Sequence, residues 1–192
     1  MAEPAVQHRV TPEEYLAFER AAPERHELID GEVVAMSGGT RRHALIAGKL
    51  IRVLGNALLG RPCDVFGSDL RVRIPASDLY TYPDVSVVCG ESRLEDEQDD
   101  TLENPLVIFE VLSDSTESYD RGEKFARYRT LPSLAEYVLV SQKRPLVEHF
   151  QRQGDGSWLL RTFEAGESMP LPALGCELAV DEIYLKVFDE PG

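Results

Sequence analysis

Two acidic residues lie in stretches of this sequence that otherwise have the composition of buried strands. Asp84 follows Pro83 at the start of an apolar run, and Glu110 is the one charged residue in the apolar stretch 106–112. An ionised carboxylate inside a sheet that is covered on both faces costs several kcal/mol unless it is paired or binds a cation. The two residues lie on consecutive predicted strands, so both side chains can point into one cleft. Hard oxygen ligands of this kind suit Mg²⁺ or Mn²⁺, and the sequence therefore predicts a metal site at Asp84 and Glu110.

A lysine on the next predicted helix is the candidate cation for this site. Lys124 follows the Glu110 strand within the segment Asp-Arg-Gly-Glu-Lys, and a helix that crosses back over a sheet can aim such a side chain at the cleft. The alternative is an ordinary i,i+4 pair with Asp120 on a solvated helix face. The two acidic residues also have an alternative interpretation, in which Asp84 is a strand-edge residue and Glu110 forms a salt bridge with a nearby arginine. Asp84, Glu110 and Lys124 are the candidate catalytic residues.

Two further polar residues are supporting candidates. His43 shares a predicted helical face with apolar residues, so it can be a packed histidine or a member of the site. Glu32 ends an Asp-Gly turn, so it can be a solvated hairpin carboxylate or a member of the site.

The elements that must position these side chains follow from hydrophobic periodicity and turn chemistry. Thr11, Pro12 and Glu14 are typical of a helix start, and Asp30-Gly31 between apolar runs predicts a hairpin. Residues 41–59 have apolar side chains at helical spacing and predict the main amphipathic helix. Further elements are predicted as strands at 71–74, 83–89, 106–112 and 137–140, a helix at about 119–131, and a C-terminal hairpin of 146–150 with 158–163.

The strand–helix–strand order around residues 106–140 predicts a crossover unit with parallel strands. We therefore expect one α/β domain over residues 1–192, with a mixed sheet flanked by helices, an N-terminal helix and hairpin, and a C-terminal hairpin.

The charge of the chain is strongly acidic and unevenly distributed. Lysine and arginine number 20 against 34 acidic residues, a formal net charge of −14, which argues against a histone-like nucleic-acid coat and an anionic membrane surface. The loop 91–104 holds seven acidic residues and one arginine, a charge of −6. Residues 41–73 hold seven basic and two acidic residues, a charge of +5. These basic residues either form a rim around the cleft or cover solvated helix faces.

The cysteines and apolar runs indicate the cellular compartment of the protein. Three cysteines without a CxxC pair favour neither a disulfide framework nor a cysteine-rich zinc site. The first 20 residues contain no apolar signal region, and the apolar runs are far shorter than the ~20 residues of a membrane span. We expect a soluble protein of the reducing cytoplasm, with no membrane partner.

An ordered series of motifs resembles a known nuclease family. The series consists of Glu27-Leu-Ile-Asp-Gly-Glu32, Gly67-Ser-Asp69, Pro83-Asp-Val85, Glu110-Val-Leu-Ser113 with Ser115-Thr116, Asp120-Arg-Gly-Glu-Lys124 and Glu136-Tyr-Val-Leu-Val140. It is similar to the Uma-two-type restriction endonucleases of the PD-(D/E)XK superfamily, over residues 11 to 184. The resemblance implies a restriction-endonuclease-like core, with Asp84 and Glu110 as metal ligands.

The resemblance also implies a Mg²⁺- or Mn²⁺-dependent endonuclease that hydrolyses DNA through an activated water, and a homodimer because a duplex has two strands to cut. The lysine of the E-x-K signature would stand at Leu112, so Lys124 has to supply this charge from the helix. Asp114 stands where relatives tend to have proline. These two departures favour the alternative, a catalytically lapsed nuclease fold that serves as a nucleic-acid-binding or protein-interaction module.

Overall fold

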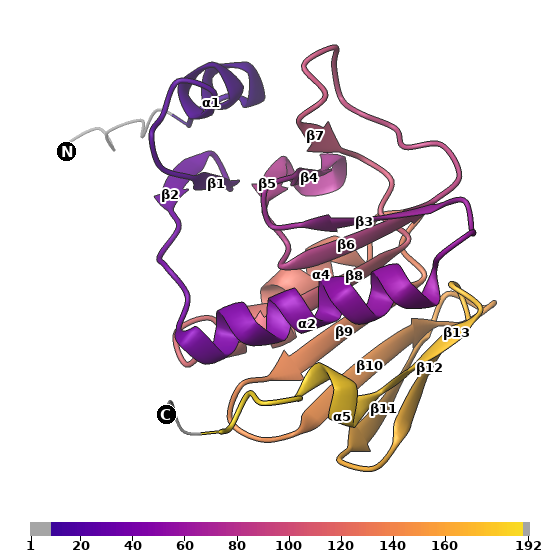
Figure 1. Cartoon of the computed structure of the whole chain (residues 1–192). Coiled ribbons are helices and arrows are strands. Elements are labelled where there is room, and N and C mark those ends of the chain that lie inside the picture. Colours follow the sequence, from indigo (N-terminus) through magenta and orange to yellow (C-terminus); the bar gives the residue numbers. More distant parts are fainter. Residues whose placement is uncertain (1–8, 190–192) are drawn as a thin grey trace, which may run out of the picture.

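The structure is a computed structural model that describes residues 9–189 (Figure 1). The two ends of the predicted domain, 1–8 and 190–192, lie outside the described residues, and so do the first eight of the 20 residues tested for a signal segment. The helices are α1 (Pro12–Glu19), α2 (Arg41–Ala57), α3 (Glu117–Tyr119), α4 (Phe125–Tyr128) and α5 (Val180–Ile183), with a 3₁₀ turn η1 (Pro75–Ser77) and a π-helix η2 (Asp120–Lys124). The strands are β1 (His26–Ile29), β2 (Glu32–Ala35), β3 (Cys63–Gly67), β4 (Arg71–Ile74), β5 (Leu79–Thr81), β6 (Val85–Cys89), β7 (Thr101–Leu102), β8 (Val107–Leu112), β9 (Glu136–Ser141), β10 (Leu146–Arg152), β11 (Trp158–Glu164), β12 (Ser168–Leu171) and β13 (Cys176–Ala179).

The larger sheet is mixed, as the sequence predicts. Its strand order is β11-β10-β9-β8-β6-β3, and β8 and β9 are parallel neighbours joined by the continuous helical segment α3–η2–α4. The other neighbours in this sheet are antiparallel. The predicted crossover unit and the C-terminal hairpin β10–β11 are therefore confirmed, and the fold is a mixed α/β fold.

Both faces of β8 are buried, which explains its nearly continuous apolar sequence. Phe109 and its alternate neighbours pack in the core beneath α2, whose buried side is formed by Ile46, Leu50, Val53 and Leu54. Ile108 and Leu112 pack on the opposite face, with Tyr128 of α4. Because side chains alternate along a strand, Glu110 faces the α4 side of the sheet.

The N-terminal segment belongs to a second sheet of order β2-β1-β5-β4-β7. Thr11 and Glu14 form the predicted capping box at the start of α1. Asp30 and Gly31 have φ values of 53° and 79°, the left-handed conformations that a two-residue hairpin turn requires. The N-terminal helix and hairpin are therefore confirmed, and the hairpin joins a sheet of its own rather than the one that carries Asp84 and Glu110.

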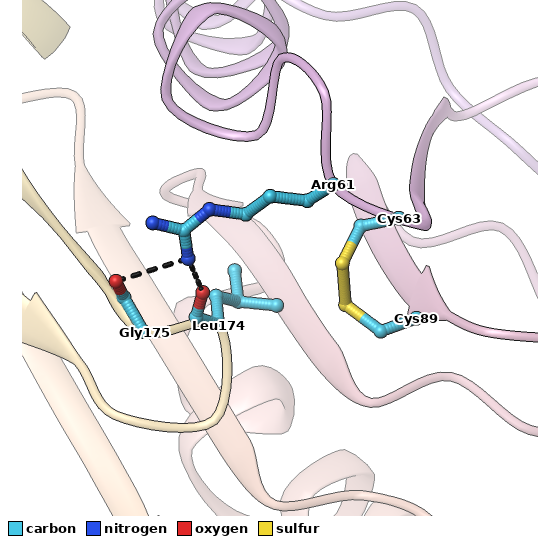
Figure 2. The surroundings of a disulfide bond; sticks show 5 residues. All are labelled: Arg61, Cys63, Cys89, Leu174 and Gly175. Atoms are coloured by element: carbon cyan, nitrogen blue, oxygen red, sulfur yellow. Dashed lines mark hydrogen bonds between the residues drawn. A yellow bond between two sulfur atoms is a disulfide. The ribbon is translucent and has the colours of Figure 1, made fainter.

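A disulfide joins Cys63 and Cys89, which the sequence did not predict (Figure 2). The two cysteines are direct partners in the antiparallel pair β3–β6, although they are 26 residues apart in sequence. The pairing was missed because β3 itself was not predicted, so nothing in the sequence placed Cys63 opposite Cys89. Cys176 is free. No helix of the described residues is both long enough and apolar enough to cross a bilayer.

Candidate active site

The pairing of β6 with β8 places Asp84 opposite Glu110. Val85 pairs with Phe109 in this antiparallel ladder, so one step further along the same register Asp84 faces Glu110. The carboxylate of Asp84 accepts a hydrogen bond from the backbone N–H of Val111 at 2.7 Å. The structure therefore brings the two predicted metal ligands together at one end of β6.

Lys124 lies against the Glu110 carboxylate. Its Nζ atom is 2.8 Å from Glu110 Oε1 and 3.7 Å from Asp120 Oδ1, and its side chain is only 8% exposed. The i,i+4 pair with Asp120 is thus present, but on a buried face rather than a solvated one. Lys124 ends the π-helix η2, a rare helical form that often occurs at functional sites. Leu112, which stands at the usual lysine position, is buried in the core.

His43 belongs to this cluster rather than only to the core. Thr40 caps α2 through the backbone N–H of His43, which places the histidine in the first turn of the helix. Its Nε2 atom is 2.7 Å from Asp84 Oδ1. The hydrogen bond to Asp84 raises the pKa of His43, against the opposing effect of its partial burial.

Glu32 does not reach the cluster, and Glu27 takes part instead. Glu32 is an exposed residue of β2, and among the described residues we find no contact between it and the site. Glu27 of β1 lies 3.8 Å from Lys124 Nζ and accepts a hydrogen bond from the hydroxyl of Thr81. One signal for Glu27 was available, since it is an acidic residue beside buried Leu28 in a short strand, the pattern that identified Asp84.

Two tyrosines hold the buried polar groups of the site in place. The hydroxyl of Tyr128 donates a hydrogen bond to Glu110 Oε1 at 2.8 Å, so that this oxygen has both Tyr128 and Lys124 as partners. The hydroxyl of Tyr137 donates to the backbone carbonyl of Asp120 at 3.0 Å, which fixes η2 against β9. Neither tyrosine was among the site residues predicted from the sequence.

The site contains more negative than positive charge. Three carboxylates, those of Glu27, Glu110 and Asp120, lie within 4 Å of the Lys124 ammonium. Asp84 adds a fourth carboxylate to the cluster and is paired with His43. Burial raises the pKa of Glu110 to about 8; Lys124 counteracts this shift, whereas Asp120 and Asp84 add to it. Burial also raises the pKa of Asp120.

Lys124 keeps its proton in these surroundings. Burial disfavours the ammonium, but Glu110, Glu27 and Asp120 outweigh it and raise the pKa of Lys124 above its ordinary value. Lys124 therefore supplies a permanent positive charge at the carboxylates, and it cannot balance all of them.

The residues present fit a divalent metal ion of the oxygen-binding kind. Within the described residues, no group of three or more His, Cys, Asp or Glu side chains is arranged to hold a metal ion. Mg²⁺ is commonly held by one or two carboxylates, with water and phosphate oxygens as its other ligands. Asp84 and Glu110 provide this donor set, and the excess of carboxylates provides the favourable charge.

The fold and the facing carboxylates define a protein with a nuclease-like fold. The architecture matches that of a crystal structure described as a putative nuclease belonging to DUF820 from Anabaena variabilis, with a TM-score of 0.75 and 18% sequence identity. The match covers 93% of this chain and 99% of that chain. At this identity the similarity shows the fold alone, and it confirms the expected restriction-endonuclease-like core.

The sequence then identifies the family. The family described as "Uma2: Putative restriction endonuclease" matches residues 12–181, and the chain belongs to this family. Two proteins of Synechocystis sp., the uncharacterized proteins slr1290 and sll1609, are similar to it. The first is 39% identical over 176 residues, 92% of each chain, and the second is 40% identical over 151 residues, 79% of this chain and 85% of that protein. The resemblance stated from the motifs is confirmed.

Proposed function

We propose that the protein is a Mg²⁺- or Mn²⁺-dependent endonuclease that hydrolyses phosphodiester bonds in DNA. The observation that carries this proposal is the 2.8 Å contact between Lys124 Nζ and Glu110 Oε1, with Asp84 opposite Glu110 across the β6–β8 pair. Glu110 thus has Lys124 as its ion-pair partner and Asp84 as its neighbour on the adjacent strand, and all three residues are of the types that phosphodiester hydrolysis uses. Family membership supports the same reaction class.

Asp84 and Glu110 would hold the metal ion, which lowers the pKa of a bound water and neutralises charge on the scissile phosphate. The chain's own residues prepare this site. The N–H of Val111 and the ring of His43 fix the orientation of the Asp84 carboxylate. Tyr128 fixes Glu110 in the same way.

Lys124 has an electrostatic part in the reaction. Its ammonium is buried and permanently charged, so it can stabilise negative charge that develops on the phosphate without first reorganising. Glu27 and Asp120 hold the ammonium from its other sides. No covalent intermediate with the protein is needed.

The two sequence departures have structural explanations that support an active enzyme over a lapsed one. Leu112 fills the core on the α4 side of the sheet, and Lys124 supplies the positive charge at Glu110 that a lysine at position 112 would supply. Asp114 is 85% exposed and pairs with Lys143 at 2.9 Å, so its charge is balanced at the surface. The alternative, a catalytically lapsed nuclease fold, would be supported if the experiments below detect neither metal binding nor nicking.

Nicking of supercoiled plasmid DNA in Mg²⁺ or Mn²⁺ tests the proposal. We expect Asp84→Asn, Glu110→Gln and Lys124→Met each to lower the nicking rate by about 100-fold or more, the usual cost of removing a transition-state electrostatic group. Lys143→Met is the matched control, because this lysine is exposed and outside the cluster.

Metal titration of the same variants completes the test. Wild type should bind Mn²⁺, and Asp84→Asn and Glu110→Gln should not. A wild type that neither binds metal nor nicks would leave only the lapsed nuclease fold, and equal nicking by wild type and Lys124→Met would remove Lys124 from the mechanism.

We also propose that two copies act together on a duplex, because one site cuts one strand at a time. Linear product that appears without prior accumulation of nicked circles, at protein concentrations where sedimentation shows a dimer, is the expected result.

A further inference from the structure

Most basic side chains near the second sheet are already neutralised. Arg71 pairs with Asp100 at 2.6 Å and Arg73 pairs with Glu95 at 2.8 Å, so both are engaged by the acidic loop 91–104. Arg61 donates to backbone carbonyls of the turn between β12 and β13 (Figure 2). These three arginines are therefore engaged by other groups of the protein, so the basic rim that the sequence left open as one of two alternatives does not include them.

The remaining basic residues of this region all lie on α2. The helix contains no acidic residue and four basic ones, Arg41, Arg42, Lys49 and Arg52. Across the part of the chain that the structure describes, ion pairs involve other cations and none of these four. Arg42 lies over the ring of Phe188, and Arg52 contacts only the backbone carbonyl of Glu182. The helix thus carries an uncompensated charge of +4 in a protein of −14.

Helix geometry places Arg41 and Arg52 on one side of α2. Arg41 and Arg52 are eleven residues apart, about three turns, so they point in nearly the same direction and are about 17 Å apart along the axis. The opposite side of α2 packs on the sheet, and the helix crosses in front of it in Figure 1. We call the four basic residues together the α2 basic face.

The first turn of α2 lies at the carboxylate cluster. His43, in the first turn between Arg42 and the body of the helix, contacts Asp84 at 2.7 Å. The N-terminal end of α2, with Arg41 and Arg42 in its first turn, therefore lies next to the proposed reaction site.

Stability does not explain this distribution of charge. Positive side chains near the N-terminus of a helix oppose the helix dipole, and the first turn of α2 has Arg41 and Arg42 with no acidic residue to offset them. The charges on α2 also repel one another because no carboxylate lies among them.

We propose that the α2 basic face binds the sugar–phosphate backbone of the nucleic acid whose scissile phosphate lies at Asp84 and Glu110. The inference rests on the proposed function and adds the path of the substrate. Arginine and lysine contacts with phosphates are independent of base sequence and fix the register of a strand on the protein. A repeating line of negative charge is the ligand that matches four unpaired cations spread along about 17 Å.

Salt-dependent binding of labelled DNA tests the inference. The probe is a fluorescein-labelled 30-base-pair duplex, titrated in EDTA to prevent cleavage, at several KCl concentrations from 50 to 200 mM. Each lost phosphate contact reduces the slope of log K against log salt by about 0.9. Arg41→Gln/Arg52→Gln should therefore reduce the slope by about 2 and weaken binding by about tenfold to a hundredfold at 0.1 M salt.

Arg129→Gln/Arg161→Gln is the matched control, because both arginines are exposed and neither lies on α2. Three results would each overturn the inference. The slope of log K against log salt could be the same for wild type and Arg41→Gln/Arg52→Gln, the two double variants could lose the same DNA affinity, or wild type could fail to bind DNA.

Plasmid nicking separates this inference from the proposed function. If wild type nicks DNA but Arg41→Gln/Arg52→Gln binds DNA as tightly as wild type, the proposed endonuclease activity is supported and DNA binding by the α2 basic face is refuted. If DNA binding shows the expected slopes of log K against log salt but wild type does not nick DNA in Mn²⁺, DNA binding by the α2 basic face is supported and the endonuclease activity is refuted.

Discussion

Replacing Glu110 with glutamine should stabilise the protein in the absence of metal while abolishing its activity. Burial raises the pKa of Glu110 from an ordinary value of 4.5 to about 8. Between these two values the unfolded chain releases the Glu110 proton and the native protein retains it. The contribution that protonated Glu110 makes to the stability of the fold is therefore fully present below pH 4.5 and is lost as the pH rises towards 8.

The size of the effect follows from the same shift. One pKa unit corresponds to about 1.4 kcal/mol, so the native state loses up to about 3 kcal/mol by pH 7 and up to about 5 kcal/mol by pH 8. Glutamine carries no charge, and its carbonyl oxygen can still accept the hydrogen bonds of Tyr128 and Lys124. Part of the stabilisation gained by Glu110→Gln is offset because Lys124 loses an ionic partner. We expect a net stabilisation of roughly 1–3 kcal/mol at pH 8, several degrees in melting temperature for a chain of this length.

Thermal melts of wild type and Glu110→Gln from pH 5 to pH 9 in EDTA measure this. The wild-type melting temperature should fall with pH more steeply than that of the variant. Glu123→Gln is the control, because Glu123 is exposed on the same helical segment and should follow wild type. Adding Mg²⁺ should raise the melting temperature of wild type only, because ligands stabilise the state that binds them. Parallel pH curves for wild type and Glu110→Gln would refute the assignment of Glu110 as a buried, destabilising acid.

Three other changes test separate parts of the structure. Cys63→Ala/Cys89→Ala should cost about 3–4 kcal/mol, from the chain entropy of a loop of 26 residues, and dithiothreitol should lower the melting temperature of wild type but not of this variant; a variant as stable as oxidised wild type would contradict the disulfide. Arg20 and Arg71 hold the pKa of Asp100 well below its ordinary value, so this carboxylate stabilises the fold above about pH 4 and loses its contribution as the pH falls below that. Asp100→Asn should accordingly cost about 1 kcal/mol at pH 7, after allowance for solvent screening, and clearly less near pH 2 in denaturant titrations; an equal cost at both pH values would argue against the ion pairs. Tyr128→Phe removes the hydroxyl that donates to Glu110 and should cost about 1–3 kcal/mol in denaturant unfolding at pH 9, where Glu110 is mostly charged, with less cost at pH 5; a pH-independent cost would show that packing alone accounts for it.

The sequence could identify the acidic pair because an acidic residue in an apolar strand is a local anomaly. Asp84 and Glu110 are each visible in this way, and their positions at the end of β6 and within β8 agree with the predicted strands. Lys124 required the family resemblance, since its alternative as a solvated i,i+4 partner of Asp120 was equally consistent with the local sequence. The structure shows the pair with Asp120 buried, a property that depends on how η2 packs on the sheet.

Glu27 and the disulfide were missed for a different reason, namely that both depend on contacts between segments far apart in sequence. Glu27 reaches Lys124 because β1 pairs with β5 in the second sheet and Thr81 of β5 binds the carboxylate. Cys63 meets Cys89 because β3, which is short and interrupted by a charged residue, pairs with β6. Short strands of this kind have weak periodicity, so their partners follow from tertiary packing rather than from local pattern.

A net charge of −14 is compatible with a polyanionic substrate because screening limits the distance over which each charge acts. At 0.1 M ionic strength the Debye length is about 10 Å, so a phosphate at α2 responds mainly to the four cations of the α2 basic face. At 0.01 M it is about 30 Å, and the whole acidic surface then opposes binding. The affinity of wild type for duplex DNA should therefore stop rising, or fall, as salt is lowered below about 30 mM. Anisotropy titrations between 10 and 200 mM KCl measure this, and a log–log plot that stays linear down to 10 mM would show that the acidic loop and the other carboxylates lie too far from the bound strand to matter.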